Sequence, residues 1–363
     1  VVTLSVTGSG LNSPDVKFRI APNASCASDL TTDIVVTAGS SKAGGQGSTP
    51  GPEVAGVYTG LRPVRTLCML SIVAYHVRWS ASAATEPLLG ISFGLTTLQV
   101  ILCALVARGA REVPASSFLR RRAARLLRPW LIWSLVYLAV RVAQSARYGH
   151  GWDDQLEPSM VLVGGAFHLW FLPYGFAASA AAWGLLRLTR GPRALGGAIA
   201  GAMLGGATLL VSSASSATLQ PWPPLNLWLD GLPAVFFGVA IGRALSLEGA
   251  RRRRAMLLLI VAAAVVPVWL GGGWLPWSQL WARYAVAVPL AVVGVLWRAP
   301  SFRLLTWLAE RNMGVYVVHI LVLQAVDRVS VLHGAPDALR ILTVYVGSLM
   351  TVAGIAAARR AVR

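Results

Sequence analysis

Leu61 to Trp79, LRPVRTLCMLSIVAYHVRW, is an apolar stretch that contains two widely spaced ionisable side chains. Arg65 lies near its start and His76 follows eleven residues later. In an α-helix this spacing places both side chains on one face, about 16 Å apart along the axis. Ionisable residues are costly in lipid, and where they occur in a span they indicate a functional site. The stretch therefore predicts a membrane helix with a functional polar face.

The composition of the whole chain agrees with a membrane protein. Of its 363 residues 55% are hydrophobic and 13% are charged, and the mean hydropathy is +0.62. Soluble domains carry about 25% charged residues, so much of this surface faces a medium other than water. The net charge of +18 would suggest nucleic acid in a soluble chain. Here the arginines lie between apolar runs, as topology signals do, so no nucleic-acid partner is expected.

The apolar runs predict an all-α integral membrane protein of about ten transmembrane helices. Arginines gather in alternate loops, for example Arg120–Arg128 and Arg251–Arg254, and again at the C-terminus. Positively charged loops stay in the cytoplasm, so both termini are expected there. We expect a multi-pass protein of the bacterial cytoplasmic (inner) membrane, with a membrane domain over residues 61–359. The ten runs are 63–81, 88–107, 129–145, 168–187, 194–212, 225–246, 255–270, 277–297, 303–325 and 337–357.

Residues 1–57 differ from the rest of the chain. VVTLSV, VKFRIA and DIVVTA are short strand-like runs separated by turn-forming residues. Gly39 to Pro52 is rich in Gly, Ser and Pro, a composition typical of a flexible linker. The segment is either a genuine polar extension or the result of a wrongly assigned start of the chain. No function is assigned to it.

His76 has two interpretations. A lone histidine in a membrane helix commonly forms a hydrogen bond to a neighbouring helix, which is a structural role. A neutral imidazole can also accept a proton near pH 7 as a general base. Because His76 shares a helix face with Arg65, we take both as candidate catalytic residues.

A dense basic segment, FLRRRAARLLRPW, follows the second apolar run from Phe118 to Trp130. Arg122, Arg125 and Arg128 recur every three residues, so on a short helix they would form a tilted basic stripe. Pro129 is expected to open the third span, because proline suits the first helical turn. The arginines either retain the loop in the cytoplasm or bind the phosphates of a ligand, for which the guanidinium is suited. The second interpretation makes them candidate binding residues for a cytoplasmic ligand that carries phosphate.

Two further stretches place polar side chains in the predicted spans. His168-Leu-Trp-Phe-Leu-Pro173 begins the fourth span, and Glu310 to His319, ERNMGVYVVH, lies in the ninth. His319 should lie about 13 Å above Glu310, at a depth comparable to that of His76. Tyr316 would lie one turn below it. Together these residues predict a polar intramembrane cavity.

The outer loops are rich in tryptophan and contain Asp153 and Asp154. The tryptophans either form the aromatic belt of the membrane interface or stack against sugar rings at an outward-facing site. No spacing of His or Cys predicts a metal site. The candidate substrate-binding residues are His168, Trp170, Tyr316, His319, Asp153 and Asp154.

Four of these features, in this order, resemble the membrane-bound acyltransferase family 3. They are Arg65-x10-His76, the Arg122-x-x-Arg125 loop ending at a proline, His168-Leu-Trp-Phe-Leu, and Gly314-Val-Tyr-Val-Val-His319. The resemblance covers about 61–359. In the family a proline follows the second motif arginine by about three residues, whereas Pro129 follows Arg125 by four and Arg128 by one. The motif pair is therefore Arg122 with Arg125 or Arg125 with Arg128.

The resemblance implies an enzyme that transfers acetyl or other acyl groups to hydroxyls of exopolysaccharides, O-antigens, peptidoglycan, lipids or antibiotics. The expected donor substrate is acyl-CoA, with acetyl-CoA as the default, and no permanently bound cofactor is expected. The expected acceptor is a carbohydrate or lipid-linked saccharide, and proteins of polysaccharide assembly are candidate partners. The alternatives are a transporter or flippase of lipid-linked sugars or amphiphiles, and a structural membrane subunit.

Overall fold

The computed structural model describes residues 58–80, 93–109, 113–148, 158–188, 194–215, 223–274, 279–300, 302–329 and 335–362. These ranges contain helices and no strand, which confirms the all-α prediction. The expected strand-like extension, residues 1–57, lies outside them. The helices are α1 (Leu61–Ser80), α2 (Phe93–Gly109), α3 (Ala115–Tyr148), α4 (Met160–Val163), the 3-10 helix η3 (Phe167–Trp170), α5 (Phe171–Leu188), α6 (Ala194–Ser215), α7 (Pro223–Ala244), α8 (Gly249–Trp274), α9 (Gln279–Leu296), α10 (Arg303–Val326) and α12 (Asp337–Ala361).

Each of the ten predicted apolar runs overlaps one of the long helices of the described ranges. Four segments of the described chain are long and apolar enough to cross a membrane by themselves: Ala115–Arg147, Phe167–Arg187, Leu225–Ala244 and Asp337–Ala361. Other apolar helices, such as Phe93–Gly109, are shorter. The helices thus support a membrane protein, while the number of spans and the side of each terminus stay predictions.

The third span begins much earlier than expected. α3 is continuous from Ala115 to Tyr148, with Pro129 inside it, so the prediction that Pro129 opens the helix is wrong. Alanine, leucine and arginine are strong helix formers, and these residues dominate the segment before Pro129. Phe118 and Leu126 of this segment also pack in the apolar core. Tertiary packing therefore joins the arginine-rich segment and the span in one helix.

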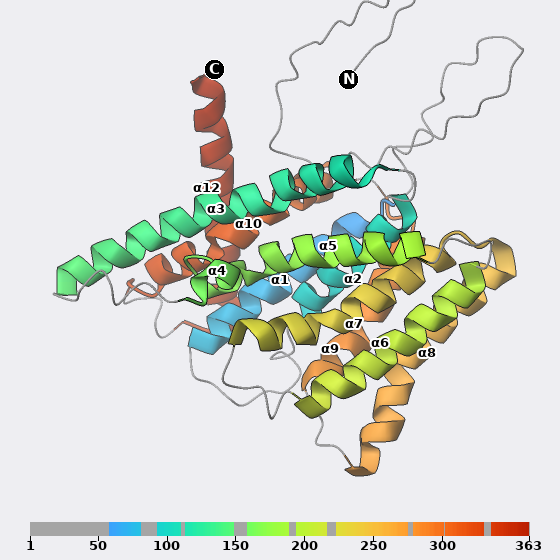
Figure 1. Cartoon of the computed structure of the whole chain (residues 1–363). Coiled ribbons are helices and arrows are strands. Elements are labelled where there is room, and N and C mark those ends of the chain that lie inside the picture. Colours follow the sequence, from blue (N-terminus) through green and yellow to red (C-terminus); the bar gives the residue numbers. More distant parts are fainter. Residues whose placement is uncertain are drawn as a thin grey trace, which may run out of the picture.

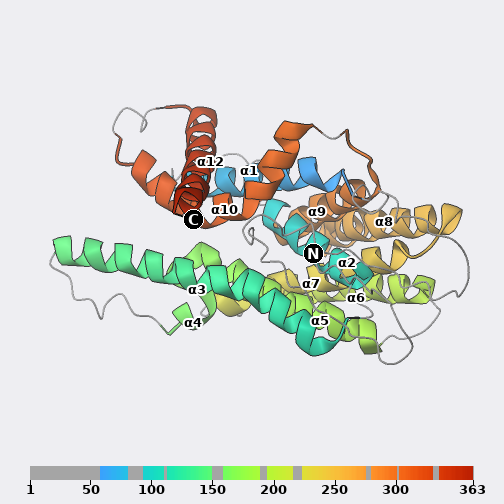
Figure 2. The ribbon, with the colours of Figure 1, turned by 90° about the horizontal axis from the view of Figure 1, so that it is seen from above.

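The buried apolar side chains form two clusters that share α1, α2 and α7. One lies among α1, α2, α3, α5, α7, α10 and α12 and surrounds the candidate site. The other lies among α1, α2, α6, α7, α8 and α9. Figure 1 shows α3 along one edge of the bundle with α5 beneath it, and α12 rising steeply across. In Figure 2, α1, α10 and α12 are grouped on one side, opposite α3 and α5.

Small residues bring α2 and α7 together. A Cβ added to Gly238 would meet Cys103 and the Val100 carbonyl oxygen, and one added to Gly242 would meet Ala107 and the Ala104 carbonyl oxygen. The two glycines lie four residues apart on one face of α7, the spacing that lets membrane helices approach closely. Because the residue numbers rise together along both helices, α2 and α7 run parallel.

Candidate active site

Three histidines from distant parts of the chain meet inside the bundle. His76 comes from α1, His168 from η3 and His319 from α10. The ring centroids of His76 and His319 are 4.8 Å apart, and those of His168 and His319 are 5.2 Å apart. The His319 Nε2 atom lies 3.3 Å from His76 Nδ1. The expectation that His76 and His319 lie at matching depth is therefore confirmed.

Backbone carbonyl groups fix the hydrogen-bonding role of two ring nitrogens. His319 Nδ1 lies 2.7 Å from the carbonyl oxygen of Tyr316, and His76 Nδ1 lies 2.9 Å from that of Ile72. A carbonyl oxygen only accepts, so in each neutral ring Nδ1 carries the hydrogen and Nε2 carries the lone pair. His76 Nδ1–H then also faces the acceptor Nε2 of His319. This arrangement leaves His76 Nε2 as a proton acceptor.

The three rings differ in exposure. His319 is fully buried and His168 is 6% exposed, whereas His76 keeps a partly exposed surface. Of the three, His76 is therefore the side chain best able to meet a substrate. The Ile72 carbonyl oxygen and His319 Nε2 both face Nδ1 of this ring and orient it, as a general base requires.

The backbone before α5 holds His168 in place. The Tyr316 hydroxyl donates to the His168 carbonyl oxygen, and the Tyr137 ring lies 5.0 Å from the His168 ring, edge to face. Gly164, in the turn before η3, has a φ of 83°, a conformation that favours glycine. His168 Nε2 is a buried nitrogen for which the described residues supply no hydrogen-bond partner. Such an atom is available to a ligand.

Arg65 lies at the other end of the α1–α10 contact. Its Nη2 atom donates to the Ala309 carbonyl oxygen at 3.1 Å, and its side chain is 8% exposed. Ala309 and His319 are ten residues apart on α10, about 15 Å along the axis. α1 and α10 therefore run parallel, with Arg65 and His76 both facing α10. This confirms the predicted common face of Arg65 and His76.

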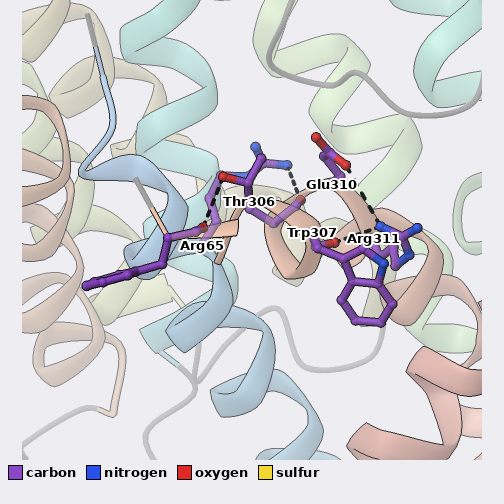
Figure 3. Close-up of polar contacts among 7 residues, drawn as sticks. Arg65, Thr306, Trp307, Glu310 and Arg311 are labelled. Carbon is purple, nitrogen blue, oxygen red and sulfur yellow. Dashed lines mark hydrogen bonds and ion pairs between the residues drawn. The ribbon is translucent and has the colours of Figure 1, made fainter. Parts of the chain in front are cut away.

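Figure 3 shows Arg65 against the first turns of α10, with Trp307, Glu310 and Arg311 grouped to one side of it. The Arg311 guanidinium lies 4.1 Å from the Trp307 ring centroid and donates to the Trp307 carbonyl oxygen at 3.0 Å. It also forms an ion pair of 3.8 Å with Glu310, whose side chain is 41% exposed. Two arginines of different helices thus lie at the end where α10 begins.

The three arginines of α3 do not share one environment. Arg122 is buried over the Phe118 ring at 5.5 Å, Arg125 is partly exposed and Arg128 is exposed. A step of three residues falls short of one helical turn by about 60°, so Arg128 points about 120° away from Arg122. The expected basic stripe therefore winds around α3, and its last member, Arg128, points away from the bundle. The structure favours Arg122 and Arg125 as the pair that faces inward.

The remaining predicted residues are placed as follows. Trp170 is 7% exposed and packs against Tyr174 with a centroid distance of 5.5 Å, so it offers little free surface. Tyr316 is buried beside His168, as its hydrogen bond requires. Asp153 and Asp154 lie outside the described residues, and their proposed role stays a prediction.

Two residues of the site were not singled out from the sequence. Tyr137 of α3 donates to the Val317 carbonyl oxygen at 2.9 Å and joins α3 to α10. Asn312 of α10 is 5% exposed, and the described residues supply no partner for either atom of its amide. A polar residue inside an apolar run was the available signal for Asn312. Tyr137 gave no such signal, because tyrosine is common in spans.

The family model described as an acyltransferase domain, that of acyltransferase family 3, matches residues 59–360. No curated protein and no solved structure matches the chain. Within the described ranges, no group of three His, Cys, Asp or Glu side chains is arranged to hold a metal ion.

Proposed function

The chain belongs to acyltransferase family 3, and from this membership and the site geometry we propose that it is a membrane O-acyltransferase of a bacterium. It takes an acyl group, acetyl by default, from cytoplasmic acyl-CoA. It transfers this group to a hydroxyl of a surface or exported carbohydrate, such as a polysaccharide repeat unit or a glycolipid. It does so in the cytoplasmic membrane, with ten spans and both termini in the cytoplasm.

One observation carries the proposal: His76 Nδ1 lies 3.3 Å from His319 Nε2, at the end of the α1–α10 contact opposite to Arg65. The contact thus joins a proton acceptor and a cation that are about 16 Å apart. An acyl-CoA places its phosphates and its thioester at opposite ends of an extended arm. In the proposed complex the phosphates lie toward Arg65, Arg122 and Arg125, and the thioester lies beside His76.

The reaction follows from the hydrogen-bonding roles of the histidines. His76 Nε2 takes the proton of the acceptor hydroxyl while the oxygen attacks the thioester carbon. The new C–O bond forms, the C–S bond breaks, and the thiolate leaves with the proton returned from His76. The lone pair of His319 Nε2 faces His76 Nδ1–H and stabilises the imidazolium. General-base catalysis of this kind contributes about 10²–10⁴-fold, and alignment of the substrates supplies much of the rest.

The relative directions of the helices support the ten-span topology. If every consecutive long helix crosses the membrane once, α1 and α10 are the first and ninth spans and must run parallel. α2 and α7 are then the second and sixth spans and must also run parallel. Both pairs do so in the described part of the chain. α10 and α12 are consecutive and antiparallel, since Asp327 at the end of α10 pairs with Arg340 near the start of α12.

The test is the variant His76→Ala. Surface carbohydrate from cells that express the wild-type chain should carry O-acyl groups, and cells with His76→Ala should lose them, although the protein stays in the membrane. Purified wild-type protein in detergent should bind labelled acetyl-CoA with an affinity that falls as salt rises, and His76→Ala should bind it equally well. A transporter or flippase would not bind acetyl-CoA. Full acylation by His76→Ala would disprove the role of His76.

A further inference from the structure

Asn312 combines deep burial with a side-chain amide that has no partner in the described structure. An unpaired buried amide costs about 1–3 kcal/mol, so such groups are rare without a ligand or another function. Neither the proposed proton transfer nor the arginines use this residue. Its position on α10 indicates which ligand group it meets.

Asn312 lies on the face of α10 that carries the site. It is seven residues before His319, which is almost two helical turns, so both side chains point to the same side. Ala309, whose carbonyl oxygen accepts from Arg65, is one turn earlier. The opposite face packs on α12, because a Cβ added to Gly314 would meet Val352. Asn312 therefore lies between the Arg65 end and the histidines.

The distance of Asn312 from His319 along α10 matches one part of an acyl-CoA donor. The residue lies about 10 Å below His319 along the helix axis. In an extended pantetheine arm, the amide carbonyl carbon farther from the sulfur is eight bonds away. At about 1.2 Å per bond, as in extended peptide backbone, this is also about 10 Å. The carbon beside this carbonyl carries the pantoyl hydroxyl.

The side-chain amide of asparagine is complementary to this group. A primary amide presents an N–H donor and a carbonyl acceptor on one edge. An α-hydroxy amide presents a carbonyl acceptor and an O–H donor on one edge. We propose that Asn312 positions the donor by pairing with the pantoyl α-hydroxy amide of acyl-CoA. Asn312 Nδ2–H donates to the pantoyl carbonyl oxygen, and the pantoyl hydroxyl donates to Asn312 Oδ1. This inference rests on the proposed function.

The experiment uses the full-length protein in detergent and two probes, acetyl-CoA and an acetyl-CoA analogue that lacks the pantoyl hydroxyl. The wild type should bind the analogue about tenfold more weakly than acetyl-CoA, the effect of about one buried hydrogen bond. Asn312→Leu should bind acetyl-CoA at least tenfold more weakly than the wild type. Its affinities for the two probes should differ by less than twofold, because the hydrogen-bond partner of the pantoyl hydroxyl is gone.

Two controls keep the test decisive. Leucine removes an unpaired polar group and keeps the number and branching of the side-chain heavy atoms, so the melting temperature of Asn312→Leu should equal or exceed that of the wild type. Asn226→Leu, which removes the amide of another asparagine with an unpaired Oδ1 atom on α7, should leave both affinities unchanged. Equal discrimination by the wild type and Asn312→Leu would overturn the inference while leaving the proposed function intact. A wild type that binds no acetyl-CoA would overturn both.

Discussion

At the scale of single residues, the contact between His76 and His319 predicts that a change at His319 affects the chemical step more than the binding of the donor. His319 is fully buried and lies 3.3 Å from His76, so we expect it to act as a positioning residue. His319→Leu removes one of the two acceptors that face His76 Nδ1–H, the other being the Ile72 carbonyl oxygen. It should lower kcat about 10²-fold, a loss within the range of general-base catalysis. The KM for acetyl-CoA should change little.

The amide oxygen of glutamine can accept the same hydrogen bond, so His319→Gln should recover part of the lost kcat. Steady-state kinetics with acetyl-CoA on membranes of each variant checks this. If His319→Leu raised KM and spared kcat, His319 would contribute to donor binding instead of orienting His76.

The arginines of α3 give a second prediction at this scale. Arg125 is partly exposed on the inward side of the helix, whereas Arg128 is exposed and points elsewhere. Arg125→Gln should weaken the binding of acetyl-CoA about five- to tenfold, because a guanidinium contact to phosphate is lost. Arg128→Gln makes the same change on the same helix and should weaken binding less than twofold.

Titration of labelled acetyl-CoA at low and high salt measures both affinities. The difference between the two variants should shrink at high salt, since salt screens exposed charges. A stronger loss in Arg128→Gln than in Arg125→Gln would assign the motif to Arg125 and Arg128.

Most of these residues could be singled out from the sequence, but the contacts between them could not. The eleven-residue spacing of Arg65 and His76 follows from helix geometry alone, and the structure agrees. The exposure of Arg122, Arg125 and Arg128 depended on the true start of α3, which tertiary packing decides. The pairing of Tyr137 with Val317 joins segments 180 residues apart. No local pattern encodes such a contact.

At the scale of elements, the turn from α4 to η3 fits closely onto α3. A Cβ added to Gly165 would collide with the carbonyl oxygen of Ser134 and lie 3.1 Å from the backbone nitrogen of Leu138. Both are backbone atoms of a helix and cannot move aside. Gly165→Ala should therefore displace η3, which carries His168, and destabilise the protein by about 1–3 kcal/mol.

Gly184→Ala in α5 is the matched control, because a Cβ there would meet nothing within 4 Å. It should be neutral or stabilise the helix by up to about 1 kcal/mol. Melting temperatures in detergent and acetyl transfer should fall together in Gly165→Ala and stay unchanged in Gly184→Ala. A fully active and stable Gly165→Ala would show that the turn does not position His168.

The sequence predicted the helices better than their ends. Each apolar run became a helix because burial of apolar side chains in a membrane requires internal backbone hydrogen bonds. The start of α3 was missed by fourteen residues, since a proline inside a helix is tolerated where the surroundings hold the helix together. η3 was also unexpected. It separates His168 from the regular part of α5 and directs the ring toward α10.

At the scale of the whole molecule, the alternating arginine loops and the parallel pairs α1–α10 and α2–α7 converge on one topology. In it the turn between α7 and α8 is cytoplasmic, and the turn after α10 faces outward. Glu248 and Arg328 are exposed in these two turns. After replacement of Cys26, Cys68 and Cys103 by serine, the variants Glu248→Cys and Arg328→Cys each carry one thiol.

The outer membrane of intact cells is first made permeable to small reagents. A maleimide that cannot cross the cytoplasmic membrane should then label Arg328→Cys. It should label Glu248→Cys only after the cytoplasmic membrane is permeabilised. The reason is that α8, α9 and α10 lie between the two positions, and three crossings place them on opposite sides. Retained acetyl transfer in both variants would show that the fold is intact. Labelling of both positions from outside would contradict the ten-span topology, and with it the cytoplasmic position of Arg65.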